Sequence, residues 1–425
     1  MNAFARRDGA LLVDDLPLEA LAQRFGTPLY VYSAAAISAR YRAFDSAFAA
    51  HPHRICYAVK ANSSLGILQL LAGLGAGFDI VSGGELERVL RAGGAPGSVV
   101  FSGVGKSRAE IDRALAVEIG CFNVESAAEL ERLEEAASAA GRVAPVSIRV
   151  NPDVDAATHP YISTGLKENK FGVSAPRARE LYARAARSDA LRITGIDCHI
   201  GSQLTRLGPF EDALRRVLEL VDVLAADGIE LEHLDLGGGL GVRYSDEAPP
   251  SAEAYAAALL EVLGGRPQTL VFEPGRWLVG EAGVLLTRVE YEKDNEGRHF
   301  LVVDAAMNDL LRPALYQSWH DIEPVTERRE RVERLVDVVG PVCESADFLG
   351  KQRPIAAAAG DLLAVRSAGA YGFGMASNYN SRNRAAEVLV VDGAAHEIRR
   401  RETLDDQLAP ERLLPGPVRA ASGAR

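Results

Sequence analysis

Eight short apolar segments rich in β-branched residues recur between residues 55 and 276, and each stops at a polar or glycine-rich stretch. Segments with helical periodicity separate most of them, and another amphipathic segment, 34–50, precedes the first. Eight strands alternating with helices over about 250 residues are typical of a (β/α)8 barrel, here entered helix first. The predicted strands are 55–61, 78–82, 99–103, 120–126, 145–151, 193–201, 231–239 and 268–276.

The pattern changes after residue 280, where predicted strands follow one another without helices between them. They are 284–291, 300–304, 332–339, 361–367 and 386–392. Such a series is typical of a mostly antiparallel β domain. We therefore expect an N-terminal segment, 1–33, that contributes to the β domain through the strand "ALLV" at 10–13. The barrel would follow at 34–280, and the β domain, with a frayed tail from residue 414, at 281–425.

Composition limits the partners of this 425-residue chain. Its net charge of −11 argues against nucleic acid or an anionic membrane, since both attract a basic surface. No apolar segment follows Arg6 and Arg7, and the most apolar stretch, 65–78, is too short to span a bilayer. The expected location is the cytoplasm.

The four cysteines are far apart and have neither CxxC spacing nor a matching histidine cluster. We therefore expect no metal site and no disulfide framework. Cys56, Cys121 and Cys198 lie in predicted strands, where a free cysteine usually serves as a small buried hydrophobe.

Active sites of such barrels lie at the carboxyl ends of the strands, so the residues after each predicted strand are the candidates. They are Lys60, Asn62, Ser82 to Glu85, Asn151, His199 to Gln203, Gly237 to Gly241, and Glu273 to Arg276. Lys60, in "YAVKAN", follows an apolar flank that is expected to lower the pKa of its amine.

Each candidate alone has an ordinary structural explanation. Turns use glycine freely, His199 is compatible with a core position, and Glu273 and Arg276 are compatible with an ion pair. Their convergence on one face favours another explanation. A nucleophilic lysine, a glycine loop with an arginine, a buried glutamate and a flat histidine ring are the groups that pyridoxal phosphate requires.

One long insertion, 153–173, interrupts the barrel rhythm and contains "THPYISTGLKENKFGV". A loop of that length after a barrel strand is usually functional, so we expect a lid over the active site.

Long ordered blocks carry a family resemblance. They include "YAVKAN", "GAGFDIVSGGELERVL", "HIGSQ", "DLGGGLG", "EPGR", "MNDLLRPALY", "VCESADFL" and "GAYGFGMASNYNSR". The chain resembles the fold-type III pyridoxal phosphate-dependent decarboxylases, most closely the diaminopimelate decarboxylase family. That resemblance implies a TIM barrel with an alanine racemase-like β domain. Two residues depart from the family's sequence pattern: Asn383 stands where a proline is expected, and Gln352 stands where an aspartate is expected. Neither is among the residues given roles.

The resemblance implies roles for individual residues. Lys60 would carry pyridoxal 5'-phosphate, His199 would stack on its ring and Glu273 would face the pyridine nitrogen. The other cofactor-binding positions would be Ser202, Gly239, Pro274, Gly275, Arg276 and Tyr371. The substrate-binding positions would be Arg276, Arg312, Tyr316, Glu344 and Tyr371, with Cys343 as proton donor.

The implied reaction converts meso-diaminopimelate to L-lysine and carbon dioxide, the last step of lysine biosynthesis, in a homodimer whose active sites are shared across the interface. The alternatives are a decarboxylase of arginine, ornithine or carboxynorspermidine, a racemase, and a non-catalytic pseudo-decarboxylase that binds the cofactor. Arg312 disfavours a cationic substrate side chain. No tyrosine is clearly available for the second face that a racemase needs, and pseudo-enzymes usually lose Lys60 or Cys343.

Overall fold

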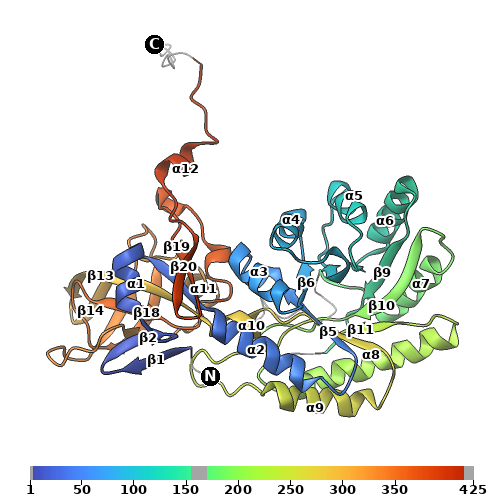
Figure 1. The fold of residues 1–425 in the computed structure, drawn as a ribbon, viewed down its shortest axis with the longest axis horizontal. Coiled ribbons are helices and arrows are strands. Elements are labelled where there is room, and N and C mark those ends of the chain that lie inside the picture. The colour runs from blue at the N-terminus through green and yellow to red at the C-terminus, as the bar shows by residue number, and fades with distance from the viewer. Residues whose placement is uncertain (1–2, 155–169, 416–425) are drawn as a thin grey trace.

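The computed structural model describes residues 3–154 and 170–415. The larger of the two parts of the fold is a closed barrel of eight parallel strands, which confirms the predicted barrel (Figure 1). The strands are β5 (His53–Ala58), β6 (Gly77–Ile80), β7 (Val99–Phe101), β8 (Cys121–Val124), β9 (Ala144–Arg149), β10 (Leu191–Asp197), β11 (His233–Asp235) and β12 (Thr269–Phe272). Pairing of β12 with β5 closes the barrel.

Helices surround the barrel and precede or follow its strands in alternation (Figure 1). They are α2 (Ala34–Ala47), α3 (Leu65–Gly73), α4 (Gly83–Arg91), α5 (Arg108–Ala116), α6 (Ala127–Ala140), α7 (Ala175–Ala185), α8 (Gly208–Ala226) and α9 (Ala252–Leu263). Each buries an apolar face against the strands, and one continuous hydrophobic core results.

All eight predicted barrel strands are present, but the predictions extended every one of them too far at the carboxyl end. For β6 and β8 the reason is helix capping. The side chains of Ser82 and Ser126 accept hydrogen bonds from backbone N–H groups of α4 and α6, so these serines begin helices. Similarly, β5 stops at Ala58, and Lys60 lies in the following 3-10 turn η1 (Val59–Ala61).

A nine-stranded sheet forms the second part, and most of its neighbouring strands are antiparallel, as predicted. Its strands are β4 (Leu29–Ser33), β13 (Gly283–Asn295), β14 (Arg298–Val303), β15 (Ile322–Pro324), β16 (Arg334–Val339), β17 (Phe348–Ile355), β18 (Leu362–Val365), β19 (Ala386–Val391) and β20 (Ala394–Arg399). Five of these were predicted. The sequence pattern did not mark β4, β15, β17 or β20.

The N-terminal segment enters this sheet through β4, which pairs with β13 and β19 directly before α2. The predicted strand at 10–13 exists as β2 (Ala10–Val13), but it lies in a separate small sheet with β1 (Phe4–Arg7) and β3 (Leu16–Pro17). An isolated β-bridge pairs Ala10 with Thr326, just beyond β15, and the backbone N–H of Leu11 donates to the Val325 carbonyl at 2.8 Å. Four shorter helices complete the fold: α1 (Leu18–Phe25), α10 (Arg276–Val279), α11 (Arg312–Tyr316) and α12 (Leu404–Leu408).

Two predicted features fall largely outside the described residues. Most of the predicted lid belongs to 155–169, and most of the predicted frayed tail belongs to 416–425. Among the described helices, none combines the length and the apolar character that a bilayer span requires.

Candidate active site

Lys60 forms an ion pair at the barrel mouth. Its Nζ donates to Asp79 Oδ2 at 2.6 Å, and Asp79, in β6, is completely buried, whereas 38% of the Lys60 side chain is exposed. Burial alone lowers the pKa of this amine, but the negative charges of Asp79 and Glu273 outweigh that effect and raise the pKa above its ordinary value. The expectation of a lowered pKa was therefore wrong, because it considered the apolar flank without the carboxylate on the next strand.

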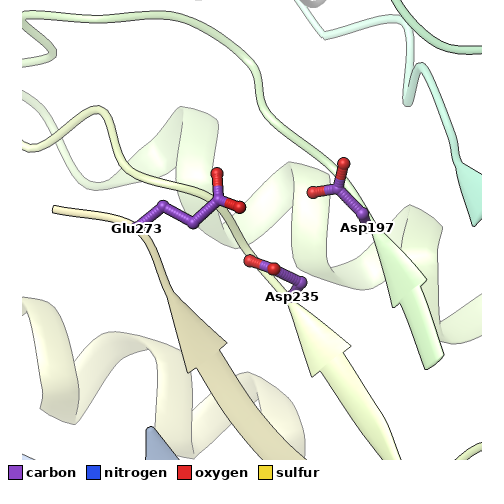
Figure 2. A group of neighbouring side chains, drawn as sticks. All are labelled: Asp197, Asp235 and Glu273. Atoms are coloured by element: carbon purple, nitrogen blue, oxygen red, sulfur yellow. The ribbon is translucent and has the colours of Figure 1, made fainter. Parts of the chain in front are cut away.

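Three buried carboxyl groups meet at adjacent strand ends. One oxygen each of Asp197, Asp235 and Glu273 lies within 4.8 Å of the others, and Figure 2 shows the three side chains converging from neighbouring strands. Burial raises the pKa of Glu273, and the charges of Asp235, Asp79 and Asp197 raise it further. Burial likewise raises the pKa of Asp235, to about 6. A cationic group beside Glu273 would therefore be strongly stabilised.

His199 follows β10 and accepts a hydrogen bond at Nδ1 from the backbone N–H of Gly238, 3.2 Å away. Since Nδ1 is the acceptor, the ring proton resides on Nε2. Burial and the charges of Arg149 and Lys60 lower the pKa of His199 well below its ordinary value. The ring is thus a neutral, flat group at the barrel mouth.

The glycine loop after β11 lies too close to its neighbours for side chains. A Cβ on Gly238 would lie 2.3 Å from the Glu273 carbonyl oxygen, and one on Gly239, whose φ is +111°, would lie 2.6 Å from the Gly201 carbonyl oxygen. The backbone of this loop therefore packs directly against the turn that begins at Glu273.

That turn also contacts the segment that carries the lysine. The Pro274 carbonyl accepts from Ala58 N at 3.5 Å, and a Cβ on Gly275 would lie 2.8 Å from the Ala61 side chain. Tyr371, which follows β18 in the second part of the fold, donates its backbone N–H to the Ala61 carbonyl at 2.7 Å. The two parts of the chain thus meet at the turn that contains Lys60.

Arg276, at the start of α10, is 6% exposed and oriented by hydroxyl groups. Its Nη1 donates to Tyr244 Oη at 2.7 Å, and its Nη2 donates to Ser202 Oγ at 3.0 Å. Its guanidinium carbon lies 4.7 Å from the centre of the Tyr371 ring. Among the described residues Arg276 forms no ion pair with Glu273 or any other carboxylate.

Arg312, the first residue of α11, is 5% exposed and also lies against Tyr244, with its guanidinium carbon 4.4 Å from the ring centre. Its Nη1 donates to His320 Nε2 at 2.8 Å, whereas its buried Nε–H has no acceptor within the described chain. Burial lowers the pKa of Arg312, and the charge of Arg276 lowers it further. Tyr316 ends the same helix. Arg276 and Arg312, here called the arginine pair, form a cationic site without a carboxylate of the described chain.

Cys343 and Glu344 lie on the exposed turn between β16 and β17. The Cys343 backbone N–H donates to Asn380 Oδ1 at 2.8 Å, and Tyr379 Oη donates to Glu344 Oε1 at 2.6 Å. In the part of the chain that the structure describes, no hydrogen bond or ion pair joins them to Lys60 or the arginine pair.

The remaining cysteines are buried and free, as predicted. Several residues of the site were not among the predicted ones. The aspartates within or at the end of apolar strands were a detectable signal, because an unpaired carboxylate is costly there. Nothing in the sequence pattern marks the tyrosine and the histidine that contact the arginine pair. These unpredicted residues are Asp79, Asp197, Asp235, Tyr244 and His320.

Comparison with known proteins places this geometry in a family. Residues 34–280 match the family model described as "Pyridoxal-dependent decarboxylase, pyridoxal binding domain". The diaminopimelate decarboxylase of Pseudomonas aeruginosa is 63% identical over 98% of this chain and 100% of its own, and that of Haemophilus influenzae is 56% identical over 97% and 99%.

Solved structures agree. The Helicobacter pylori diaminopimelate decarboxylase complexed with L-lysine is 45% identical, with a TM-score of 0.90 over 92% of this chain and 98% of its own. The enzyme of M. jannaschii in co-complex with L-lysine is 38% identical, with a TM-score of 0.93 over 97% and 98%. This chain belongs to the diaminopimelate decarboxylase family of pyridoxal-dependent decarboxylases.

Proposed function

We propose that this chain removes carbon dioxide from meso-diaminopimelate to give L-lysine, with pyridoxal 5'-phosphate bound at the barrel mouth. The observation that carries the proposal is the arginine pair, a cationic site beside the Lys60 turn with no carboxylate of the described chain to neutralise it. Two full-length relatives bear this activity in their names, which supports the same assignment.

The residues present fit the cofactor. The barrel mouth holds an amine, a buried carboxyl group, a neutral imidazole and a loop in which only glycine fits. When bound, pyridoxal phosphate supplies an electron-withdrawing ring that stabilises the negative charge left on the α-carbon after carbon dioxide departs.

Three residues would prepare the site for that chemistry. Lys60 would be the covalent anchor, and Asp79, 2.6 Å from its Nζ, would hold the amine in place at the barrel mouth. Glu273 would hold the pyridine nitrogen protonated, since a cation at that point relieves the repulsion among the three buried carboxyl groups.

The rest of the cofactor site would hold and orient the ring and phosphate. The neutral His199 ring would lie against the pyridine ring. The phosphate positions would be Ser202, Gly239, Pro274, Gly275, the Arg276 backbone and Tyr371.

The arginine pair would select the substrate. A guanidinium offers a planar set of donors that matches a carboxylate, and the free Nε–H of Arg312 gives one such donor. Diaminopimelate presents a distal carboxylate there, whereas ornithine and arginine present a cation. Tyr316 and Tyr371 would line this position, and Glu344 would bind the distal amine.

Cys343 would protonate the α-carbon after carbon dioxide leaves. It is exposed, and among the described residues no hydrogen bond joins it to the Lys60 turn of its own chain, which supports a role in the active site of a partner subunit. The proposed assembly is therefore a homodimer with active sites shared across the interface.

Carbon dioxide release from meso-diaminopimelate, ornithine, arginine and lysine, measured side by side with the cofactor-loaded protein, tests the proposal. We expect turnover of meso-diaminopimelate to exceed the others by at least about 100-fold, because an unpaired buried cation disfavours a cationic side chain. Equal turnover of ornithine or arginine would refute the assignment.

A further inference from the structure

His320 contacts the arginine pair through a hydrogen bond whose direction is unambiguous. A guanidinium has no acceptor, so Arg312 Nη1 must donate to His320 Nε2, 2.8 Å away. On the other side of the ring, the backbone carbonyl of Arg366 lies 2.8 Å from Nδ1 and can only accept. The two contacts together fix a neutral imidazole with its proton on Nδ1.

The surroundings of His320 keep the ring neutral and immobile. The residue is completely buried, and its ring and the Tyr244 ring form a T-shaped pair with 5.1 Å between ring centres. Burial and the neighbouring Arg312 charge lower the pKa of His320 to about 3. The ring therefore remains an acceptor toward Arg312 throughout the physiological pH range.

The anchor of His320 belongs to the nine-stranded sheet. Arg366 directly follows β18, and its backbone N–H donates to the Asp321 carbonyl at 2.8 Å. Its side chain is ion-paired with Glu323 in β15. The position of the Arg312 guanidinium therefore depends, through His320, on the paired strands β15 and β18.

A neutral hydrogen-bond partner leaves the positive charge of an arginine in place, whereas a carboxylate partner offsets it. The buried Arg149 is paired with Glu125, which offsets its charge. Arg312 is oriented by an imidazole instead, and its Nε–H remains without an acceptor in the described chain. An imidazole can direct one edge of the guanidinium while leaving the full positive charge available to an incoming anion.

We propose that His320 is a positioning residue for substrate specificity: by accepting from Nη1 of Arg312, it turns the remaining donors of that guanidinium toward the distal carboxylate of the substrate. This inference rests on the proposed function, in which Arg312 binds that carboxylate. His320 itself would not touch the substrate.

Competitive inhibition by L-lysine and by cadaverine tests the inference on the cofactor-loaded enzyme, because the two molecules differ only in the distal carboxylate. We expect the unmodified enzyme to bind L-lysine more tightly. His320→Asn can still donate to the Arg366 carbonyl but is too short to accept from Arg312. It should weaken L-lysine binding by about tenfold or more and cadaverine binding by less than about twofold.

His320→Gln is the matched control, because its amide oxygen can occupy the Nε2 position. We expect it to bind L-lysine within about threefold of the unmodified enzyme. Adding His320→Asn to Arg312→Gln should change L-lysine binding by less than about twofold, because the histidine acts through the arginine. Equal loss of both inhibitors in His320→Asn, or unchanged L-lysine binding, would overturn the inference.

A measurement on the unmodified side chain keeps the inference testable if His320→Asn does not fold. With 15N-labelled histidine, and with the signal assigned by its absence in His320→Gln, NMR should show a protonated Nδ1 and an unprotonated, hydrogen-bonded Nε2. A protonated Nε2 would overturn the inference. Failure of the proposed function is distinguishable, because the unmodified enzyme would then show no turnover of meso-diaminopimelate and no preference for L-lysine over cadaverine.

Discussion

Lys60 Nζ and Asp79 Oδ2 lie 2.6 Å apart across the neighbouring barrel strand ends, and Asp79 has no solvent exposure. The second oxygen of Asp79 has no hydrogen-bond partner among the described residues. This pair helps to set the protonation state of the lysine. Burial is the largest single influence and lowers the pKa of Lys60, but the charges of Asp79 and Glu273 together outweigh it.

Asp79→Asn should therefore lower the pKa of Lys60 and increase the fraction of neutral amine at any given pH. In cofactor-free protein, the pH midpoint for capture of added pyridoxal phosphate, followed by visible absorbance, should move down by about one pH unit or more. Asp112→Asn, which removes an exposed partner of Arg108, is the control and should leave the midpoint unchanged. An unchanged midpoint in Asp79→Asn would contradict this account of the pair.

Lys60→Ala and Cys343→Ala test the shared active site. Lys60→Ala should lack the visible absorbance of the bound cofactor, whereas Cys343→Ala should keep it and lose turnover by about 100-fold to 10,000-fold, the usual contribution of a general acid. Mixed after dissociation and reassociation, the two variants should recover about a quarter of normal activity, because half of the dimers are hybrids with one intact site each. No recovery, with hybrid dimers demonstrated, would place Cys343 and Lys60 in the same subunit's site.

Tyr244→Phe removes the hydroxyl group that accepts from Arg276 at 2.7 Å but keeps the ring that lies against Arg312. Losing one hydrogen bond to a charged group costs about 1.5 to 3 kcal/mol. We expect KM for meso-diaminopimelate to rise by about 10-fold to 100-fold, with a smaller change in kcat. Tyr244→Leu, which also removes the ring, should be the more severe variant, and a Tyr244→Phe enzyme with normal KM would argue against this role.

Asp235→Asn tests the buried carboxyl groups in cofactor-free protein. A folded-state pKa of about 6, above the ordinary 3.8, means that folded Asp235 binds more protons than unfolded Asp235 between these pH values. Its contribution to stability therefore falls as pH rises through that window. The unfolding free energy of Asp235→Asn minus that of the unmodified protein should rise by about 2 to 3 kcal/mol from pH 4 to pH 7, measured by denaturant unfolding at each pH.

Asp227→Asn is the opposite-sign control for that experiment. The ion pair with Arg179 lowers the pKa of this exposed carboxyl group, so it stabilises the fold at neutral pH and loses that effect as pH falls. Its replacement should thus give no relative gain in stability with rising pH. If the stability difference between Asp235→Asn and the unmodified protein does not change with pH, Asp235 titrates normally in the fold.

Local sequence was sufficient for the elements that repeat. Apolar strand segments and amphipathic helices predicted every barrel strand, and the serines that end two of the segments, Ser82 and Ser126, are now seen to cap the following helices. The first strand of the large sheet, β4, was missed although all five of its residues are buried, because it stands alone directly before α2 without the alternation found elsewhere.

The sequence by itself determined the barrel, the separate β domain and the candidates at the strand ends, because hydrophobic periodicity and turn residues are local properties of the chain. Only the tertiary structure decided the charge states of the site. Asp79 meets Lys60 because β5 and β6 are neighbours. His320 meets Arg312 because Arg366, directly after β18, supplies the carbonyl that orients the imidazole. The pKa of a buried group depends on charges brought near it in space, so neighbours distant in sequence determined which groups are protonated.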